Sequence, residues 1–304
     1  MKYTGEFNGI INIYKEKGFT SFDVVALVRK YSRTKTGHTG TLDPDAEGVL
    51  PVCLGKSTRL CDYIMGGDKE YIAGVTLGVT TDTRDASGRV TETRAVSCSP
   101  EEIIAALNSF LPGYDQLPPM YSAIKVGGKK LYELARSGKE IEIKPRRVDI
   151  SEIEFLERQG TESFKIRVAC SKGTYIRSLA HDIGQRLGCG AHMNSLLRTR
   201  SGEFSIETCV RLSEVKAAAE SGSLSGLIIP PERVLSGLAR VYVSQEAEKY
   251  LLNGNAITEE FIINGEIPGE SGAVLVFSGD GRLFGIYKTD AGGARVLRSA
   301  VRLI

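Results

Sequence analysis

Residues 37–48 read GHTGTLDPDAEG, with three glycines, one proline and three acidic residues in twelve positions. An ordinary turn needs fewer such residues, so the composition indicates a loop held in one conformation for chemistry. Asp43 stands directly before Pro44, whose ring disfavours helical backbone at the preceding residue. The carboxylate therefore lies on an extended loop and is a candidate nucleophile. The Asp-Pro pair by itself would only start a turn, and the surrounding residues favour the chemical interpretation.

The stretch continues to residue 60 as GHTGTLDPDAEGVLPVCLGKSTRL and resembles the hallmark motif of the bacterial tRNA pseudouridine-55 synthases, the TruB family. Further segments resemble the same family in the same order: KEYIAGVTLGVTTDTRDASG (69–88), PPMYSAIKVGGKKLYELARSG (118–138), CSKGTYIRSLAHDIG (170–184) and LLRTRSG (196–202). One departure is Leu197, where the family more often has a second arginine before Arg198, so a phosphate contact from that position is not carried over.

The resemblance implies an α+β fold, the pseudouridine synthase fold, with peripheral helices around a mixed, mainly antiparallel sheet. It implies no cofactor and no metal. It also implies a set of site residues within the matching segments and the basic stretch beside them. The implied catalytic residues are Asp43, Tyr71 and Arg177, and the implied substrate-binding residues are His38, Asp85, Lys129, Lys130, Arg146, Arg147, Tyr175 and Leu196.

Conversion of uridine to pseudouridine breaks the bond between nitrogen and ribose, turns the base over and rejoins it through carbon 5. A carboxylate can stabilise the separated sugar or add to the base, much as retaining glycosidases form a covalent intermediate. We assign this role to Asp43. Attack on ribose carbon 1′ and attack on uracil carbon 6 both remain open, because both require the same aspartate.

The reacting atoms lie within stacked RNA, so the nucleotide must be flipped out onto an aromatic or apolar face. By resemblance Tyr71 stacks on the uracil and assists proton loss at carbon 5, although a phenol with a pKa of ~10 is a weak base at neutral pH. A tyrosine in a core strand is the alternative. Leu196 matches the apolar pocket residue, and His38 matches a motif histidine that would sit beside the flipped nucleotide and help maintain the opened loop.

Arg177 lies near the start of a helix predicted over residues 176–187. A cation at a helix N-terminus opposes the macrodipole, so Arg177 requires an anionic partner, either a carboxylate or a substrate phosphate. Asp43 is the expected carboxylate, because a guanidinium keeps a partly buried aspartate ionised and in one orientation. Asp85 either shares this arginine or caps the turn closed by Gly88.

The formal net charge of +2 is unevenly distributed. Residues 121–148 hold eight basic and three acidic residues, which gives this stretch +5 and leaves the remainder at −3. Two tyrosines are interleaved with the cations, which suits a surface that binds phosphates and stacks on bases. A solvated charged face is the alternative. By resemblance, residues 118–148 form an RNA-binding insertion that holds the T arm of tRNA.

The length of 304 residues and the 41% hydrophobic content predict two domains. The first residues lack the apolar core of a signal peptide, and no uncharged apolar run approaches the ~18 residues that cross a bilayer. We therefore expect a cytoplasmic protein without membrane contact. Six scattered cysteines without a C-x-x-C pair argue against a zinc ribbon or disulfide framework. Cys189 and His192 could supply two metal ligands, but no second pair has a suitable spacing.

An interruption rich in glycine and proline within residues 213–241 indicates a domain boundary near residue 235. The predicted catalytic domain covers residues 1–235 and a second domain covers residues 236–304. The second domain contains short apolar strands around a GDG turn at residues 279–281, which indicates a compact β-rich module. It resembles a PUA domain, a small RNA-binding β-barrel that would reach the tRNA acceptor arm. A structural SH3-like appendage is the alternative.

Two other functions would use the same surfaces: a non-catalytic tRNA-binding or RNA-folding protein, and an RNA-guided pseudouridine synthase. An inactive relative would be free to lose Asp43, whereas this chain keeps it together with Tyr71, Arg177 and Leu196 in matching contexts. The complete segment at residues 118–138 favours stand-alone recognition of the T arm over guidance by RNA. We therefore expect a tRNA pseudouridine synthase that works as a monomer without a protein partner.

If the basic insertion binds the T arm, tRNA affinity should depend on salt. Neutralising Lys129, Lys130, Arg146 and Arg147 together should flatten the slope of log affinity against log salt by about one unit for each lost phosphate contact. Binding measured across a salt series checks this. An unchanged slope would identify the insertion as a solvated charged face.

Overall fold

The computed structural model describes residues 7–122, 125–126, 129–131, 143–269, 272–289 and 296–304. Its larger sheet is mixed and mainly antiparallel, as predicted, since only β3 and β12 pair in parallel. In sheet order its strands are β1 (Gly9–Lys15), β3 (Glu47–Leu54), β12 (Ala191–Ser201), β4 (Lys69–Leu77), β11 (Ser163–Cys170), β10 (Arg146–Gln159) and β7 (Gly113–Gln116), with β2 (Thr36–His38) paired to β3 and β13 (Phe204–Ser205) paired to β12.

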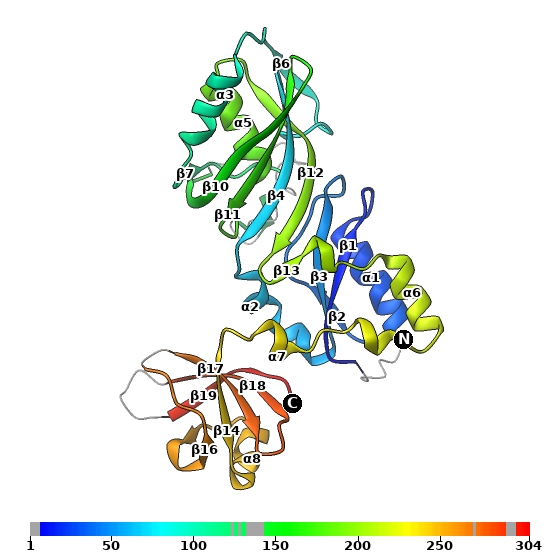
Figure 1. The fold of residues 1–304 in the computed structure, drawn as a ribbon, viewed down its shortest axis with the longest axis vertical. Helices are drawn as coiled ribbons and strands as arrows, with labels where there is room; N and C mark the ends of the chain where they lie inside the picture. Colours follow the sequence, from blue (N-terminus) through cyan, green and yellow to red (C-terminus); the bar gives the residue numbers. More distant parts are fainter. Residues whose placement is uncertain (1–6, 123–124, 127–128, 132–142, 270–271, 290–295) are drawn as a thin grey trace.

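Two groups of helices cover opposite ends of this sheet (Figure 1). At one end α3 (Pro100–Asn108) and α5 (Ile176–Arg186) pack on the strands around β4, β10 and β11. At the other end α1 (Ser21–Ser32) and α6 (Leu212–Glu220) pack on β1 and β3. Each end has its own apolar core, and β12, which lies between β3 and β4, belongs to both halves of the sheet.

Local sequence signals account for several of these elements. Alternate residues of β4 from Tyr71 to Leu77 are buried, as the alternation of apolar residues predicts for a strand. Ser99 and Glu102, with Pro100 at the first helical position, predict a capping box from the sequence, and it is confirmed at the start of α3. The helical spacing of apolar residues after Ser21 predicts that Ser21 caps this helix, and this prediction is wrong, because Thr20 is the N-cap and Ser21 is the first helical residue of α1. This displacement leaves the Ser21 hydroxyl free for another contact.

The insertion leaves and rejoins the sheet at one place. β7 and the start of β10 pair antiparallel, with Gln116 opposite Arg146 and Asp115 opposite Arg147. A short hairpin of β8 (Lys125–Val126) and β9 (Lys129–Lys130) follows within the insertion. The predicted contacts of the Lys129 and Lys130 side chains lie outside the described residues. A second hairpin, β5 (Val79–Thr81) with β6 (Val90–Thr93), flanks the segment that carries Asp85.

A second, barrel-like sheet begins at Ala239. It encloses an apolar core with α8 (Gln245–Leu252), and the predicted turn at residues 279–281 joins two of its strands. In sheet order its strands are β15 (Ile257–Thr258), β19 (Val296–Arg302), β18 (Leu283–Thr289), β17 (Ala273–Ser278), β14 (Ala239–Val243) and β16 (Ile262–Asn264).

The two sheets share a further apolar cluster. Ile10 and Val49 of the larger sheet belong to the same cluster as Leu275 and Ile286 of the smaller one. α2 (Cys61–Met65) and α7 (Pro231–Val234) lie at the junction in Figure 1. The Arg59 guanidinium adds a hydrogen bond of 2.7 Å to the carbonyl oxygen of Arg302. The smaller domain is therefore packed onto the larger one rather than only tethered to it.

This packing generates a stability prediction. Leu275→Ala should lower the free energy of unfolding by about 2–5 kcal/mol, because it opens a cavity in the shared apolar cluster. Leu252→Ala is the matched control, since Leu252 is 50% exposed in the same domain and its truncation should cost less than about 0.5 kcal/mol. Denaturant unfolding of both variants checks this, and equal losses would contradict a packed junction.

Candidate active site

Asp43 lies on the loop between β2 and β3, where a tight turn presents its side chain. The Asp43 carbonyl accepts a hydrogen bond of 3.1 Å from the Ala46 backbone, which places Pro44 at the second position of a β-turn. Leu42 and Ala46 on either side are buried. The Asp-Pro pair thus starts a turn and also holds the carboxylate at the surface of the loop.

The side chains of Ser21 and Lys15 hold this loop through hydrogen bonds to its backbone. The Ser21 hydroxyl donates to the Leu42 carbonyl at 3.0 Å and accepts from the Leu42 backbone N–H at 2.9 Å. The fully buried Lys15 ammonium donates to the carbonyls of Pro44 at 3.0 Å and Ala46 at 2.6 Å. Burial lowers the pKa of Lys15, and nearby carboxylates oppose this shift. These contacts leave the loop little freedom to move.

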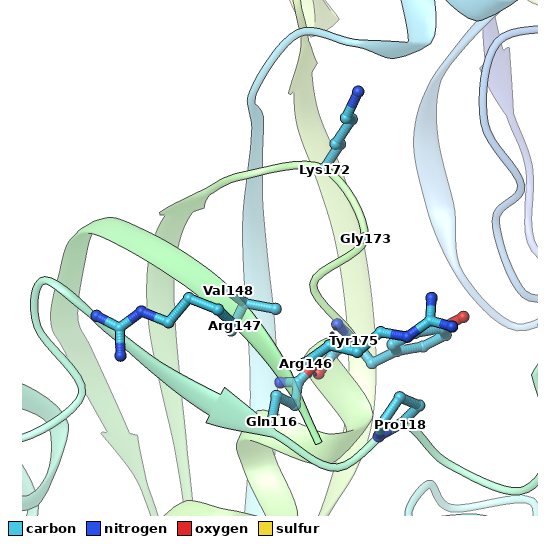
Figure 2. Close-up of a pocket in the computed structure, with 8 residues that line it drawn as sticks. All are labelled: Gln116, Pro118, Arg146, Arg147, Val148, Lys172, Gly173 and Tyr175. Carbon is cyan, nitrogen blue, oxygen red and sulfur yellow. Dashed lines mark hydrogen bonds between the residues drawn. The ribbon is translucent and has the colours of Figure 1, made fainter. Parts of the chain in front are cut away.

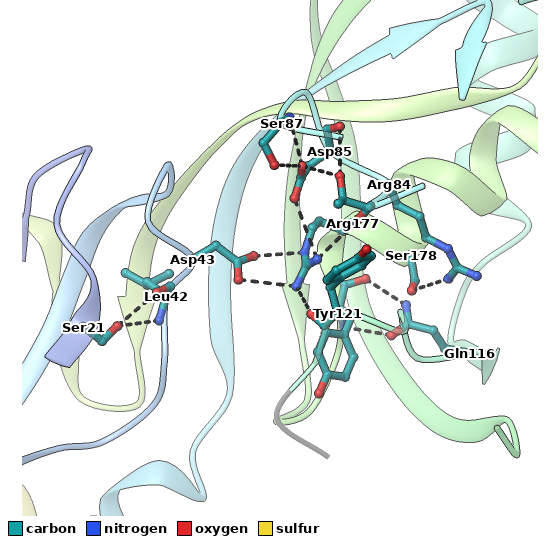
Figure 3. A network of polar contacts seen from close by, with 12 residues as sticks. Ser21, Leu42, Asp43, Arg84, Asp85, Ser87, Gln116, Tyr121, Arg177 and Ser178 are labelled. Carbon is teal, nitrogen blue, oxygen red and sulfur yellow. Dashed lines mark hydrogen bonds and ion pairs between the residues drawn. The ribbon is translucent and has the colours of Figure 1, made fainter. Parts of the chain in front are cut away.

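Arg177, near the start of α5, binds Asp43 side-on through two nitrogens (Figure 3). Arg177 Nε lies 3.0 Å from Asp43 Oδ2, and Nη2 donates to Oδ1 at 3.3 Å. The arginine side chain is only 7% exposed, whereas that of Asp43 is 39% exposed. This geometry orients the carboxylate while leaving it accessible to a substrate.

The remaining guanidinium positions contact three further groups. Arg177 Nη1 lies 3.7 Å from Asp85 Oδ2 and donates to the Thr83 carbonyl at 3.3 Å, and Nη2 donates to the Tyr121 carbonyl at 3.0 Å. The other oxygen of Asp85 accepts from the backbone and hydroxyl of Ser87. Asp85 therefore pairs with Arg177 and also stabilises its own turn, so the two alternatives drawn from sequence are both present.

The surroundings of Asp43 raise the pKa of its carboxyl group overall. Burial raises the pKa of the Asp43 carboxyl above its ordinary value, and Arg177 is the largest influence that lowers it. The like charge of Asp85 adds to the rise. Arg177 therefore favours the ionised form of Asp43 without fully offsetting the cost of burial.

Tyr71 is 8% exposed on β4 and lies directly opposite Arg198 of β12. Burial raises the pKa of Tyr71, and Arg198 opposes this rise. Arg198 is itself buried and was not among the predicted site residues, although it stands in the motif at residues 196–202. Leu196 of β12 pairs with Ala73 of β4, so only the sheet brings it near Tyr71. It is partly buried and packs against the core around β4.

His38 stands at the end of β2, before the Asp43 loop. Its Nδ1 accepts a hydrogen bond of 3.2 Å from the Gly40 backbone, which leaves the proton on Nε2 in the neutral ring. Burial and the nearby Arg198 both lower the pKa of His38, so the ring is neutral at neutral pH. His38 thus holds the start of the loop and is not charged.

Tyr175 lies beside a basic pocket of about 170 Å³ at the root of the insertion (Figure 2). Its backbone N–H donates to Gln116 Oε1 at 2.7 Å, and its carbonyl accepts from Gln116 Nε2 at 3.1 Å. Arg146, Arg147 and Lys172 contribute cations to the lining. Lys172 and Gln116 were not predicted, and the segment at residues 170–184 was the only sequence signal for the former.

Other predicted features fall outside this constellation. Cys189 is buried and His192 Nδ1 lies 2.9 Å from the Val79 carbonyl. Across the described residues, no group of three or more metal-ligating side chains comes together. None of the described helices is long and apolar enough to cross a membrane.

Chains in solved structures have the same fold and superpose on most of this chain. A chain in the structure of an H/ACA RNP bound to a substrate RNA containing 2′-deoxyuridine superposes with a TM-score of 0.73 at 28% identity, covering 97% of this chain and 84% of that chain. A chain in the crystal structure of a Cbf5-Nop10-Gar1 complex superposes with a TM-score of 0.74 at 30% identity, covering 97% and 85%.

Sequence comparison then defines the family. Residues 28–176 match the family model of the TruB family pseudouridylate synthase N-terminal domain, and residues 177–236 match that of the tRNA pseudouridylate synthase B C-terminal domain. The tRNA pseudouridine synthase B of Lachnoclostridium phytofermentans is 45% identical over 293 residues, covering 93% of this chain and 95% of the relative. That of Bacillus pumilus is 43% identical over 289 residues, covering 92% of each. The chain belongs to the TruB family of pseudouridylate synthases.

The Asp43–Arg177 pair generates a prediction about pH. Arg177→Lys keeps the charge but loses the side-on contact, so pseudouridine formation should slow by roughly 10- to 100-fold, the equivalent of one charged hydrogen bond. Because Arg177 lowers the pKa of Asp43, weaker pairing raises that pKa. The predicted role of Asp43 requires its carboxylate form. The acidic limb of the single-turnover rate profile should therefore move to higher pH.

Arg84→Lys is the matched control for this measurement. Arg84 lies beside Arg177 in Figure 3 but donates to the Leu117 carbonyl and the Ser178 hydroxyl. The acidic limb of the Arg84→Lys rate profile should stay at the same pH as in the native protein. A change in tRNA affinity alone for Arg177→Lys would identify Arg177 as a phosphate contact instead.

Proposed function

We propose that the protein is a tRNA pseudouridine synthase that isomerises the T-loop uridine at tRNA position 55. The observation that carries this proposal is the oriented, accessible carboxylate of Asp43, bound side-on by Arg177 within a TruB-family chain. Relatives that are 43–45% identical over more than nine tenths of this chain are named tRNA pseudouridine synthase B.

In the proposed reaction Asp43 attacks ribose carbon 1′ or uracil carbon 6 of a flipped uridine. The bond between nitrogen 1 and ribose breaks, the base turns over, and carbon 5 bonds to the ribose as the aspartate leaves. Arg177 holds the carboxylate in one orientation throughout. Tyr71 and Leu196 would supply the face on which the base lies, and His38 would hold the opened loop beside it.

The substrate surface continues from the site onto the insertion. Arg146 and Arg147 are exposed where the insertion joins the sheet, and they line the same pocket as Tyr175. This arrangement supports T-arm binding by Arg146, Arg147 and Tyr175. We propose Lys129 and Lys130 as further T-arm contacts from the basic sequence of the insertion. We further propose that residues 1–235 form the catalytic domain and that residues 236–304 form a PUA-like domain for the acceptor arm. A monomer acting on tRNA in the cytoplasm is the proposed working form.

The two other functions are less well supported. The chains of the H/ACA RNP and Cbf5-Nop10-Gar1 structures favour an RNA-guided relative, but they are 28–30% identical to this chain, whereas relatives named for tRNA exceed 40%. A non-catalytic tRNA-binding protein would not need Arg177 to orient Asp43 through two nitrogens. The geometry therefore favours an enzyme.

Asp43→Asn should abolish pseudouridine formation and leave tRNA affinity within a few fold, because it removes the nucleophile and no RNA-binding cation. Asp45→Asn is the control, since Asp45 is exposed on the same loop and should stay active. Unmodified tRNA is incubated with each protein, and pseudouridine is mapped by chemical adduct and mass spectrometry. Product at another uridine would refute the site assignment, and substantial turnover by Asp43→Asn would refute the nucleophile. A T-arm hairpin tested in parallel should react but bind more weakly.

A further inference from the structure

Arg198 is a buried cation whose contacts set it apart from Arg177. Its side chain is 1% exposed, and no carboxylate of the described residues lies within ion-pair distance of it. Lys15 and Lys69 are close enough for each of their pKa values to be lowered by its charge. Burying a guanidinium among like charges costs free energy, so Arg198 requires strong hydrogen bonds at this position.

Those contacts lie at both ends of the Asp43 loop. Arg198 Nη2 donates to the Gly40 carbonyl at 3.1 Å, and Nε donates to the Val49 carbonyl at 2.7 Å. The Arg198 backbone also pairs with Gly48, whose φ of +104° and closeness to the Arg198 carbonyl exclude a side chain. One residue of β12 therefore fixes where the loop begins and where it ends.

The same guanidinium faces Tyr71. Directly opposed residues of antiparallel strands place their side chains on one face of the sheet, and Arg198 opposes Tyr71 across β12 and β4. Burial is the largest influence on the pKa of Tyr71 and raises it; among the titratable groups nearby, Cys170 of β11 and Asp43 of the loop raise it further, and Arg198 lowers it. Arg198 is thus the group that favours the ionised tyrosine.

We propose that Arg198 is a positioning residue for the reaction, one guanidinium that fixes the Asp43 loop at both ends and stabilises Tyr71 as a phenolate. The inference rests on the proposed function. After carbon 5 has bonded to the ribose, the Tyr71 phenolate takes the proton from carbon 5. The electron pair of that carbon–hydrogen bond restores the double bond between carbons 5 and 6, the pair of the double bond between carbon 6 and nitrogen 1 moves to nitrogen 1, and nitrogen 1 takes a proton from water. The phenol then returns its proton to solvent.

The test compares Arg198→Met, Arg198→Lys and Arg200→Met by single-turnover rates at saturating protein across pH. Arg200 is the control, because it lies on the same strand, is partly exposed and, among the described residues, forms no hydrogen bond or ion pair with Asp43, Tyr71 or Arg177. Arg198→Met should slow the reaction by about 100-fold at neutral pH, the lower range for a general base. This deficit should shrink as pH rises, because alkaline solution ionises Tyr71 without help. Dissociation constants for tRNA should stay within a few fold of the native value.

Arg198→Lys, which keeps a cation but not the fork to two carbonyls, should recover part of the rate and the native pH profile. If Arg198→Met does not fold, Arg198→Lys tests the proposal by itself. A rate loss of about 10-fold with unchanged tRNA affinity supports the proposal. A native rate overturns it. For folded Arg198→Met, a deficit that is constant with pH, or no larger than that of Arg200→Met, overturns it. Absence of product from the native protein would instead overturn the proposed function, and this inference with it.

Discussion

The side-on contact between Asp43 and Arg177 joins two halves of the sheet that have separate apolar cores. Asp43 precedes β3, a strand of the half covered by α1 and α6, while its neighbours Leu42 and Ala46 pack in the core of the other half, where Arg177 lies on α5. A contact through two nitrogens tolerates little displacement, so it forms only when both halves keep their relative position. β12 provides this constraint, because it pairs with β3 on one side and with β4 on the other.

Three buried cations surround the Asp43 loop, and they are neutralised in different ways. Arg177 has two carboxylates within 3.7 Å, whereas Lys15 and Arg198 are bound mainly by backbone carbonyls at the loop and its ends. Carbonyl oxygens satisfy the donors without supplying a full negative charge. Asp43, Asp45 and Glu47 lie near enough to Lys15 to raise its pKa, so the charges around the loop partly compensate one another.

The barrel-like sheet and the insertion contact the rest of the chain in different ways. The smaller domain shares an apolar cluster with the larger sheet, so it adds stability as well as surface. The insertion touches the site itself, because the Tyr121 carbonyl accepts from Arg177 and Gln116 holds the backbone of Tyr175, two residues before Arg177. The root of the insertion and Arg177 are therefore held by hydrogen bonds between the same two segments of the chain.

The sequence by itself determined the strand over residues 69–77, the capping box of α3 and the loop that presents Asp43, because periodicity, capping and proline act on neighbouring residues. It also supplied the chemical groups of the site through the family motifs. Only the tertiary structure decided the partners: Thr20 caps α1 so that Ser21 can hold the loop, Lys15 lies under it, and Arg198 meets Tyr71. These contacts join residues up to 127 positions apart in β4 and β12. They depend on sheet register and on how two cores pack, which no local pattern of residues encodes.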